Sequence, residues 1–211
     1  MSDYIHVRNT YEGPSLEITG QPDPIALLHT WLDEAMRAGI EEPNAMALST
    51  VDSLGQPSSR MVLLRGLSDE GLEFYTNYTS RKAVEMADNT QVALLFFWPS
   101  VHRQVRLEGT AIFSDPKHSD TYFYERPRDH QIGAWASPQS ASIPDRKAIE
   151  ENVARFEQMF EGKEVPRPSF WGGYLVIPHQ IEFWQGRESR LHDRYRFQRT
   201  EQGWKVERLA P

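Results

Sequence analysis

Arginine side chains are concentrated in one short stretch near the end of this acidic chain. Residues 187–199 hold five arginines against two acidic residues, a local charge of +3, although the whole chain carries −7. If the stretch is a strand, alternate side chains share one face, which would carry Arg190, His192, Arg194 and Arg196. Guanidinium forks beside an imidazole suit a phosphate or a planar anionic ring. A solvated edge strand blunted by charge is the alternative, and the residues alone favour neither interpretation.

A second group of hydroxyl and cationic side chains lies at residues 74–82, where the sequence reads FYTNYTSRK. We expect a strand to end here and a helix to begin, with Arg81 and Lys82 in its first turn. Free backbone N–H groups and the helix dipole favour an anion at such a terminus, whereas cations there are locally unfavourable. The segment therefore predicts an anion site, and the alternative is a capped helix with two solvated cations.

Three further segments mix arginine with apolar residues. The sequences RMVLLR at 60–65 and RQVRLE at 103–108 are typical of strands, and RPRDHQIGAW at 126–135 indicates a loop rich in polar groups. A single arginine on a barrel exterior is more often solvated or ion-paired than bound to a ligand. Arg60 and Arg65 differ by an odd number, so a regular strand would point them to opposite faces. Either a bulge intervenes or each serves a different ligand.

Composition and motif spacing exclude several other kinds of chemistry. The chain has no cysteine, which excludes disulfides, thiolate metal sites and a cysteine nucleophile. The seven histidines show neither HxxxH nor HExxH spacing, so we expect no metal site. Rossmann, Walker and GxSxG motifs are also missing. Many cationic, aromatic and amide side chains without an activated nucleophile favour a bound cofactor that performs the difficult step while the protein holds it.

The charge balance and the hydropathy of the chain bear on its partners and location. With 211 residues, 39% of them hydrophobic and 25% charged, the chain can form one sizeable globular core. An acidic total argues against general nucleic-acid binding. The first residues do not resemble a signal peptide and no stretch is long enough to span a membrane, so we expect a cytoplasmic protein without a membrane partner.

These candidate residues must be positioned by the elements that the pattern predicts. Residues 1–22 predict an N-terminal arm or lid, and residues 23–211 a single domain. Helices are expected at 24–39, 80–88, 116–124 and 144–160, strands at 45–51, 58–67, 72–77, 91–98, 103–113, 172–178, 180–184, 190–198 and 204–209, and a loop at 127–143. Antiparallel-looking strands with short turns predict a mainly β (α+β) fold, a closed or nearly closed Greek-key-like barrel with helices packed outside.

Ten short segments then occur in an order that matches one known family. They are RMVLLR (60–65), FYTN (74–77), SRK (80–82), RQV (103–105), RPR (126–128), QIGAW (131–135), FWGG (170–173), IEFWQG (181–186), RLHDR (190–194) and RLAP (208–211). Over residues 8–211 the chain thereby resembles the pyridoxine/pyridoxamine 5′-phosphate oxidases. The resemblance implies a split β-barrel homodimer with FMN at the subunit interface. It also implies oxidation of pyridoxamine 5′-phosphate, pyridoxine 5′-phosphate or both at C4′ to pyridoxal 5′-phosphate, with O2 as acceptor and H2O2 released.

The resemblance also implies roles for individual residues. FMN would be bound, partly from the partner subunit, by Arg60, Met61, Val62, Leu63, Leu64, Arg65, Tyr75, Thr76, Arg81, Lys82, Gln104, Gln139, Ser140, Trp184 and Arg194. The substrate would be bound by Arg8, Tyr11, Arg65, Tyr122, Arg126, His130, Arg190 and His192. Arg190 and His192 would be catalytic, Arg190 by positioning the pyridine ring and His192 by accepting or relaying a proton.

Two positions depart from the family pattern. Arg65 stands where the family commonly has Lys, and His130 where it commonly has Ser. Each keeps or adds a donor for phosphate but changes its shape, so we expect altered affinity or substrate choice. Two alternatives therefore stay open: a related flavin oxidase acting on another heteroaromatic ring, such as a phenazine precursor, and a protein that binds FMN or pyridoxal phosphate without turnover.

Overall fold

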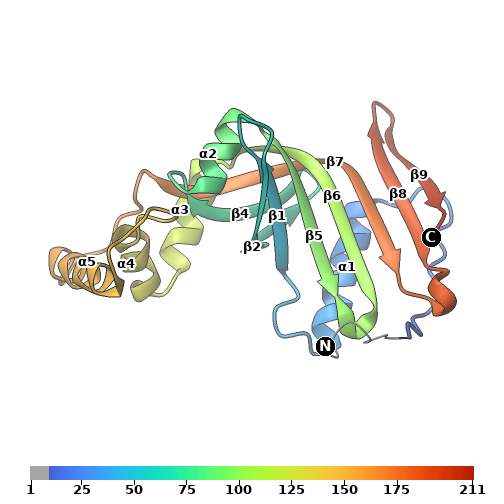
Figure 1. Ribbon diagram of the computed structural model, residues 1–211, viewed down its shortest axis with the longest axis horizontal. Helices are drawn as coiled ribbons and strands as arrows, with labels where there is room; N and C mark the ends of the chain where they lie inside the picture. Colours follow the sequence, from blue (N-terminus) through green and yellow to red (C-terminus); the bar gives the residue numbers. More distant parts are fainter. Residues whose placement is uncertain (1–9) are drawn as a thin grey trace, which may run out of the picture.

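A curled antiparallel sheet carries most of the chain (Figure 1). The computed structural model describes residues 10–211, so the predicted role of Arg8 lies outside the described residues. The strands are β1 (Ala45–Val51), β2 (Pro57–Leu63), β3 (Gly66–Ser68), β4 (Gly71–Asn77), β5 (Gln91–Trp98), β6 (Arg103–Phe113), β7 (Trp171–Gln185), β8 (Asp193–Thr200) and β9 (Gly203–Leu209). Their hydrogen-bonded order is β2-β1-β5-β6-β7-β4-β3, and β8 and β9 continue from β7.

Strand β7 is one continuous element where the sequence predicted two. It pairs with β6 on one edge, and on the other edge with β4 in its first part and β8 in its second part. Pro178 has no N–H to donate, and the register with β6 shifts between Glu108 and Gly109. A Cβ at Gly109 would lie 2.6 Å from the carbonyl oxygen of Ile177. The bulge and this glycine bend the strand without ending it.

The sheet curls into a barrel that stays open between β2 and β3, its two terminal strands. The sequence predicted one strand over residues 58–67, but β2 ends at Leu63 and β3 begins at Gly66. Leu64, between them, is buried in the main core, and its backbone N–H donates to the carbonyl of Asn44. The prediction of a mainly antiparallel, nearly closed barrel with flanking helices is confirmed.

Helices flank this sheet on two sides. They are α1 (Pro24–Arg37), α2 (Arg81–Asp88), α3 (Pro116–Glu125), α4 (Arg128–Ala136) and α5 (Arg146–Met159). Helix α1 begins as predicted, with the Asp23 side chain accepting from the N–H groups of Ile25 and Ala26. The predicted loop at 127–143 was wrong, because it contains α4, whose buried residues are Ile132 and Ala136. Two apolar contacts four residues apart are too weak a periodic signal against a polar sequence.

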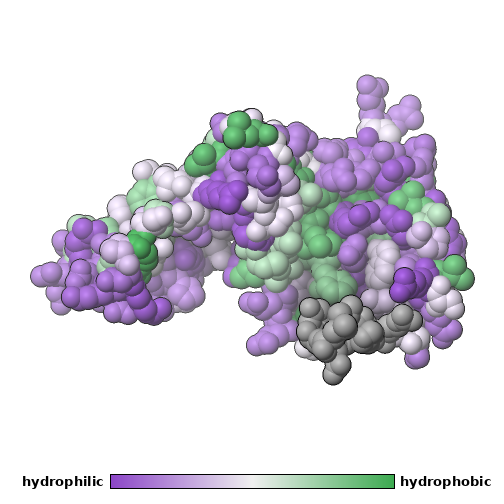
Figure 2. Space-filling view, viewed as in Figure 1, coloured by the Kyte–Doolittle hydropathy of each residue, from purple (hydrophilic) through white to green (hydrophobic). Residues whose placement is uncertain are grey.

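One face of the sheet is open and divided into an apolar and a charged part. Directly paired residues share a face, and one row across the sheet consists of Met61, Ala47, Leu95, Arg106, Glu182 and Arg196. Figure 2 shows this division as hydrophobic surface over β1 and β5 beside hydrophilic surface over β8. No helix in the described part of the chain is long and apolar enough to cross a membrane.

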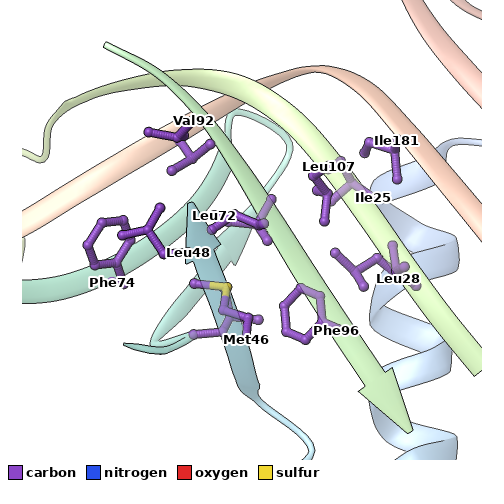
Figure 3. Packing of buried hydrophobic residues seen from close by; sticks show 14 of the residues in the cluster. Ile25, Leu28, Met46, Leu48, Leu72, Phe74, Val92, Phe96, Leu107 and Ile181 are labelled. Carbon is purple, nitrogen blue, oxygen red and sulfur yellow. The ribbon is translucent and has the colours of Figure 1, made fainter. Parts of the chain in front are cut away.

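The opposite face of the sheet packs against α1. Leu28 of the helix and Phe96, Met46 and Leu72 of the strands are fully buried in the same core (Figure 3). A second cluster of buried residues lies under α3, α4 and α5. Its members are Phe123, Ile132, Phe160, Val165 and Trp171. These three helices extend to the side of the sheet away from β8 and β9 (Figure 1).

Candidate functional site

A pocket of about 870 Å³ is lined by β2, β4, α2, α3, α4 and the loop that follows α4. It brings together many of the residues singled out by the sequence. These are Arg60, Met61, Val62, Leu63, Arg65, Tyr75, Thr76, Arg81, Lys82, Tyr122, Arg126, His130, Gln139 and Ser140. Leu64 is not among the lining residues. The break between β2 and β3 explains how Arg60 and Arg65 both reach the pocket despite their odd spacing.

One group of cations in the pocket is organised by a carboxylate. Glu85 of α2 is 5% exposed in its side chain and accepts hydrogen bonds from Arg81 Nε at 2.7 Å and from Arg60 at 3.1 Å. It also accepts from the hydroxyls of Ser58, at 2.7 Å, and Thr50. Burial opposes the charged form, but these donors outweigh it and lower the pKa of Glu85 to about 2. The carboxylate therefore stays ionised and holds the guanidinium groups of Arg60 and Arg81 beside α2.

Lys82 is buried beside this network. Only 7% of the residue is exposed, and its Nζ donates to Thr76 Oγ1 at 3.2 Å and Ser80 Oγ at 3.3 Å. Burial, and then the charge of Arg60, lower the pKa of Lys82 to about 8. The interpretation of two solvated cations therefore fails for Lys82, although it fits Arg81, whose side chain is 60% exposed.

The loop after α4 closes this part of the pocket against β4. Gln139 Oε1 accepts from Thr76 Oγ1 at 3.0 Å and from the backbone N–H of Asn77 at 3.2 Å. Ser140 has a φ of 72°, in the left-handed region. Gln139 and Ser140, far from β4 in sequence, thus lie beside the cations. Arg60, Arg81 and Lys82 against the Glu85 carboxylate give this part of the pocket a formal charge of +2, which suits a phosphate dianion.

A second group of cations lies over stacked aromatic rings. Tyr75 stacks on Tyr122 with centroids 4.2 Å apart and on Trp171 at 5.6 Å. The Arg126 guanidinium lies 4.7 Å from the Trp171 ring centroid, and the Arg65 guanidinium 5.6 Å from that of Tyr122. Arg126 Nη1 is buried with no hydrogen-bond partner among the described residues. An N–H group left unpaired beside a pocket is a ready donor for an anion.

Burial also shifts two pKa values in this group. It lowers the pKa of Arg126, and the nearby Arg65 adds to the effect. It raises the pKa of Tyr75, whose hydroxyl lies 3.3 Å from a Glu73 carboxylate oxygen. Tyr75 therefore stays a neutral phenol, and its ring stacks on that of Tyr122. His130 lines the pocket with its side chain 62% exposed, so it can turn toward a ligand.

The remaining predicted residues form a separate cluster on the open face of the sheet. Gln104 of β6 pairs with Trp184 of β7, which pairs with Arg194 of β8. Tyr11 packs edge-on against Trp184 and His192, at 5.6 Å from each. Arg194 donates to Glu182, from Nε at 2.9 Å and from Nη2 at 3.2 Å. None of Tyr11, Gln104, Trp184, Arg190, His192 and Arg194 lines the pocket.

The prediction that residues 190–198 form one strand was wrong at its start. Strand β8 begins at Asp193, because Ser189 and Arg190 have φ values of 56° and 62° in a tight helical turn, Glu188–Arg190, that cannot pair with β7. Arg194 and Arg196 share a strand face as predicted, but Arg190 and His192 do not belong to it. Arg190 is exposed.

A hydrogen bond from the backbone fixes the tautomer of the His192 ring. Its Nδ1 accepts the N–H of Arg187 at 3.1 Å. Burial, together with Arg190 and Arg194, lowers the pKa of His192. The ring is therefore neutral near pH 7, with its proton on Nε2, and it presents an N–H donor.

Sequence reasoning missed three residues that hold the predicted ones in place. Glu85 supports Arg60 and Arg81, Glu182 supports Arg194, and Trp171 supports Arg126. The spacing of four residues between Arg81 and Glu85 was a usable signal, because such pairs meet on a helix. The other two partners come from distant segments that no local spacing connects.

Comparisons with known proteins give matches over nearly the whole chain. Residues 32–160 match the family model described as pyridoxamine 5′-phosphate oxidase, and residues 171–211 match that of the pyridoxine 5′-phosphate oxidase C-terminal dimerisation region. The pyridoxine/pyridoxamine 5′-phosphate oxidase of Rubrobacter xylanophilus is 50% identical over 99% of this chain and 97% of its own. That of Synechocystis is 48% identical over 96% of this chain and 95% of its own.

Two solved structures are similar in fold. PhzG from Burkholderia lata, in complex with tetrahydrophenazine-1-carboxylic acid, superposes with a TM-score of 0.86 at 33% identity, covering 92% of this chain and 95% of its own. A pyridoxamine 5′-phosphate oxidase-related, FMN-binding protein from Nostoc punctiforme has a TM-score of 0.69 at 20% identity, covering 92% of this chain and 100% of its own. The second likeness supports the fold alone.

Proposed function

The chain belongs to the pyridoxine/pyridoxamine 5′-phosphate oxidase family, and we propose that its FMN-dependent oxidation of these vitamers takes place in the pocket at β2, at a site that two copies share. The substrates are pyridoxamine 5′-phosphate, pyridoxine 5′-phosphate or both, oxidised at C4′ to pyridoxal 5′-phosphate, with O2 as acceptor and H2O2 released. The observation that carries the proposal is that one pocket contains two groups of cations. Cofactor and substrate each bring one phosphate.

The residues present fit FMN. The buried ammonium of Lys82 and the guanidinium of Arg81 would hold the cofactor phosphate, with Arg60, Thr76, Gln139 and Ser140 around it. Backbone along residues 61–64 would meet the polar edge of the flavin ring. When bound, FMN supplies the two-electron acceptor that no side chain of this protein can provide.

The second group of cations would hold the substrate. The unpaired Nη1 of Arg126 and the fork of Arg65 would bind its phosphate, with Tyr122 and His130 beside them. A bidentate guanidinium replaces the point charge of a lysine at position 65, which favours a planar pair of phosphate oxygens. Two fixed cations orient the substrate before reaction, which lowers the entropic part of the activation barrier.

The rest of the site would come from the partner subunit. The match of residues 171–211 to a dimerisation region supports a homodimer. Trp171 in the pocket and Trp184 in the separate cluster stand thirteen residues apart on β7, and at about 3.3 Å per residue this is up to roughly 40 Å. Trp171 lines the pocket but Gln104, Trp184 and Arg194 do not, so within one chain these three residues would not contact a ligand bound there.

The open face of the sheet suits this pairing. Met61, 63% exposed, lines the pocket and also begins the row that crosses the sheet, and Phe97 is 52% exposed on the same face. Apolar surface of this kind is typical of a subunit interface. Face-to-face packing about a two-fold axis would bring Gln104, Trp184 and Arg194 of one copy to the FMN held by the other.

The same pairing would bring Arg190 and His192 to the substrate. Arg190 is too basic to accept a proton near neutral pH, so it positions the ring. His192 has its Nδ1 occupied by the Arg187 N–H, so it would donate from Nε2 to a polar atom of the substrate rather than take up a proton there. Closure by Tyr11 and a cytoplasmic location stay predictions, as does the division into an arm at 1–22 and a domain at 23–211.

A second candidate function follows from the likeness to PhzG, whose structure holds a phenazine-type ligand. Arg65 and Arg126 could also bind a carboxylate, so the chain would then oxidise a larger ring without a phosphate. The relatives named as vitamin B6 oxidases are more similar, at 50% and 48% identity, and they favour the phosphorylated vitamers.

Direct turnover tests these functions. We expect purified, FMN-loaded protein to convert pyridoxamine 5′-phosphate in air to pyridoxal 5′-phosphate, measured by the absorbance of the aldehyde, with one H2O2 per aldehyde. Turnover restricted to reduced phenazine precursors would favour the second function. Bound FMN without any product would contradict both enzymatic functions and indicate a binding protein.

The affinity for FMN should fall as the pH rises through 8. Because burial lowers the pKa of Lys82 to about 8, the ligand-free protein loses this charge above that pH, while the FMN phosphate is a dianion throughout. Above pH 8, FMN binding must then be coupled to the uptake of a proton by Lys82. We therefore expect the FMN dissociation constant to rise about tenfold between pH 7 and pH 9. Flavin fluorescence titration measures it. Lys82→Arg, which stays charged, should show little change over this range, and an equally flat wild type would contradict the assignment.

A further inference from the structure

Glu85 lies between Arg60 and Arg81, the two arginines that we assign to the phosphate of FMN. Its carboxylate lies 2.7 Å from Arg81 Nε and 3.1 Å from Arg60 Nη2, so it links α2 to β2. We propose that Glu85 is a positioning residue for the cofactor phosphate, one that fixes the directions of Arg60 and Arg81 before FMN arrives. This rests on the proposed function, because it takes the bound phosphate to be that of FMN.

The surroundings of Glu85 indicate more than helix packing. A buried carboxylate is costly unless several donors satisfy it, and here they come from three elements: Thr50 of β1, Ser58 and Arg60 of β2, and Arg81 of α2. Arg60 also donates to the carbonyl of Leu48 at 3.3 Å, which fixes the rest of its fork. Long arginine side chains lose much rotamer freedom on binding an anion, and this network removes that freedom in advance.

Charge and position make opposite predictions for this residue. Arg60, Arg81 and Lys82 against Glu85 leave a formal charge of +2, and without the carboxylate it would be +3. If Glu85 acted only through its charge, its neutralisation would strengthen the binding of a phosphate dianion. If it acts by position, the same change weakens binding, because a glutamine amide group points N–H donors at N–H donors.

The test is the discrimination between FMN and riboflavin, which lacks the phosphate. In Glu85→Gln we expect the dissociation constant of FMN to rise about tenfold and that of riboflavin to change less than about twofold, both by flavin fluorescence titration. Asp88→Asn is the matched control: it removes one negative charge from an exposed position on the same helix and should leave both constants unchanged.

Three results would overturn the inference: unchanged FMN binding in Glu85→Gln, tighter FMN binding, or equal weakening of FMN and riboflavin. If Glu85→Gln does not fold, Thr50→Val removes one buried donor to the carboxylate outside the pocket lining, and a rise of about twofold to threefold for FMN alone is expected. Wild-type protein that binds FMN no better than riboflavin would contradict the proposed phosphate site itself, a different outcome from failure of the Glu85 variant.

Discussion

At a pyridoxamine 5′-phosphate concentration well below the wild-type KM, equal amounts of Arg126→Met and Arg190→Asn subunits, each nearly inactive as a homodimer under these conditions, should together recover about a quarter of the wild-type rate. Arg126 lines the pocket, and Arg190 lies in the separate cluster that the partner would supply. In a hybrid dimer one of the two sites carries both substitutions and the other carries neither. Random pairing makes about half of the dimers hybrid, each with one intact site. Asparagine suits position 190 because the φ of 62° there is left-handed.

Subunit exchange during co-expression, with a different affinity tag on each subunit, would isolate the hybrid for assay with pyridoxamine 5′-phosphate. The matched control pairs Arg126→Met with Arg65→Met. Both residues line the same pocket, so each site of that hybrid carries one substitution and activity should stay absent. If the first hybrid is as inactive as the control, the site is not shared between subunits in the way we propose.

Arg126→Met alone should raise the KM for pyridoxamine 5′-phosphate about 100-fold with a much smaller change in kcat. The substitution removes the guanidinium that lies over Trp171 and with it the buried, unpaired N–H that we assign to the substrate phosphate. A charge-assisted pair of hydrogen bonds to phosphate contributes about 3 kcal/mol, which corresponds to this factor.

Two comparisons make this result specific. Pyridoxine without its phosphate should be a poor substrate for both proteins, with kcat/KM changed less than about threefold by the substitution. Arg128→Met changes a neighbouring arginine that donates to the carbonyls of Phe160 and Lys163, so it should lower stability and leave KM unchanged. An Arg126→Met enzyme with an unchanged KM would remove Arg126 from the substrate site.

The sequence predicted the strands well because turn residues and alternation mark them locally. The structure confirms β1, β4, β5, β6 and β9 within one or two residues. Helix α4 and the start of β8 could not be predicted from the pattern. The first has only two buried contacts, and the second depends on a left-handed turn at Ser189 and Arg190 that the residue types do not require.

The candidate site was predictable as a set of residues but not as an arrangement. Arg81 and Lys82 look alike in the sequence, yet Lys82 is buried while Arg81 is exposed, a difference set by Thr76 and Ser80. Parity along a regular strand suggested that Arg190 and Arg194 act from one face, and the break before Asp193 removes that argument. Tertiary context, rather than spacing, decides both cases.

The unbroken course of β7 from Trp171 to Gln185 has a consequence for the enzyme at low concentration. If the site is shared between subunits as we propose, β7 contributes to one catalytic centre at its beginning and to the other near its end, so a single subunit would contain no complete centre. By mass action, any flavin that binds only to the completed centres also holds the two subunits together. Dilution would then release partner and flavin as a single event, and a cell short of FMN would contain more separated chains.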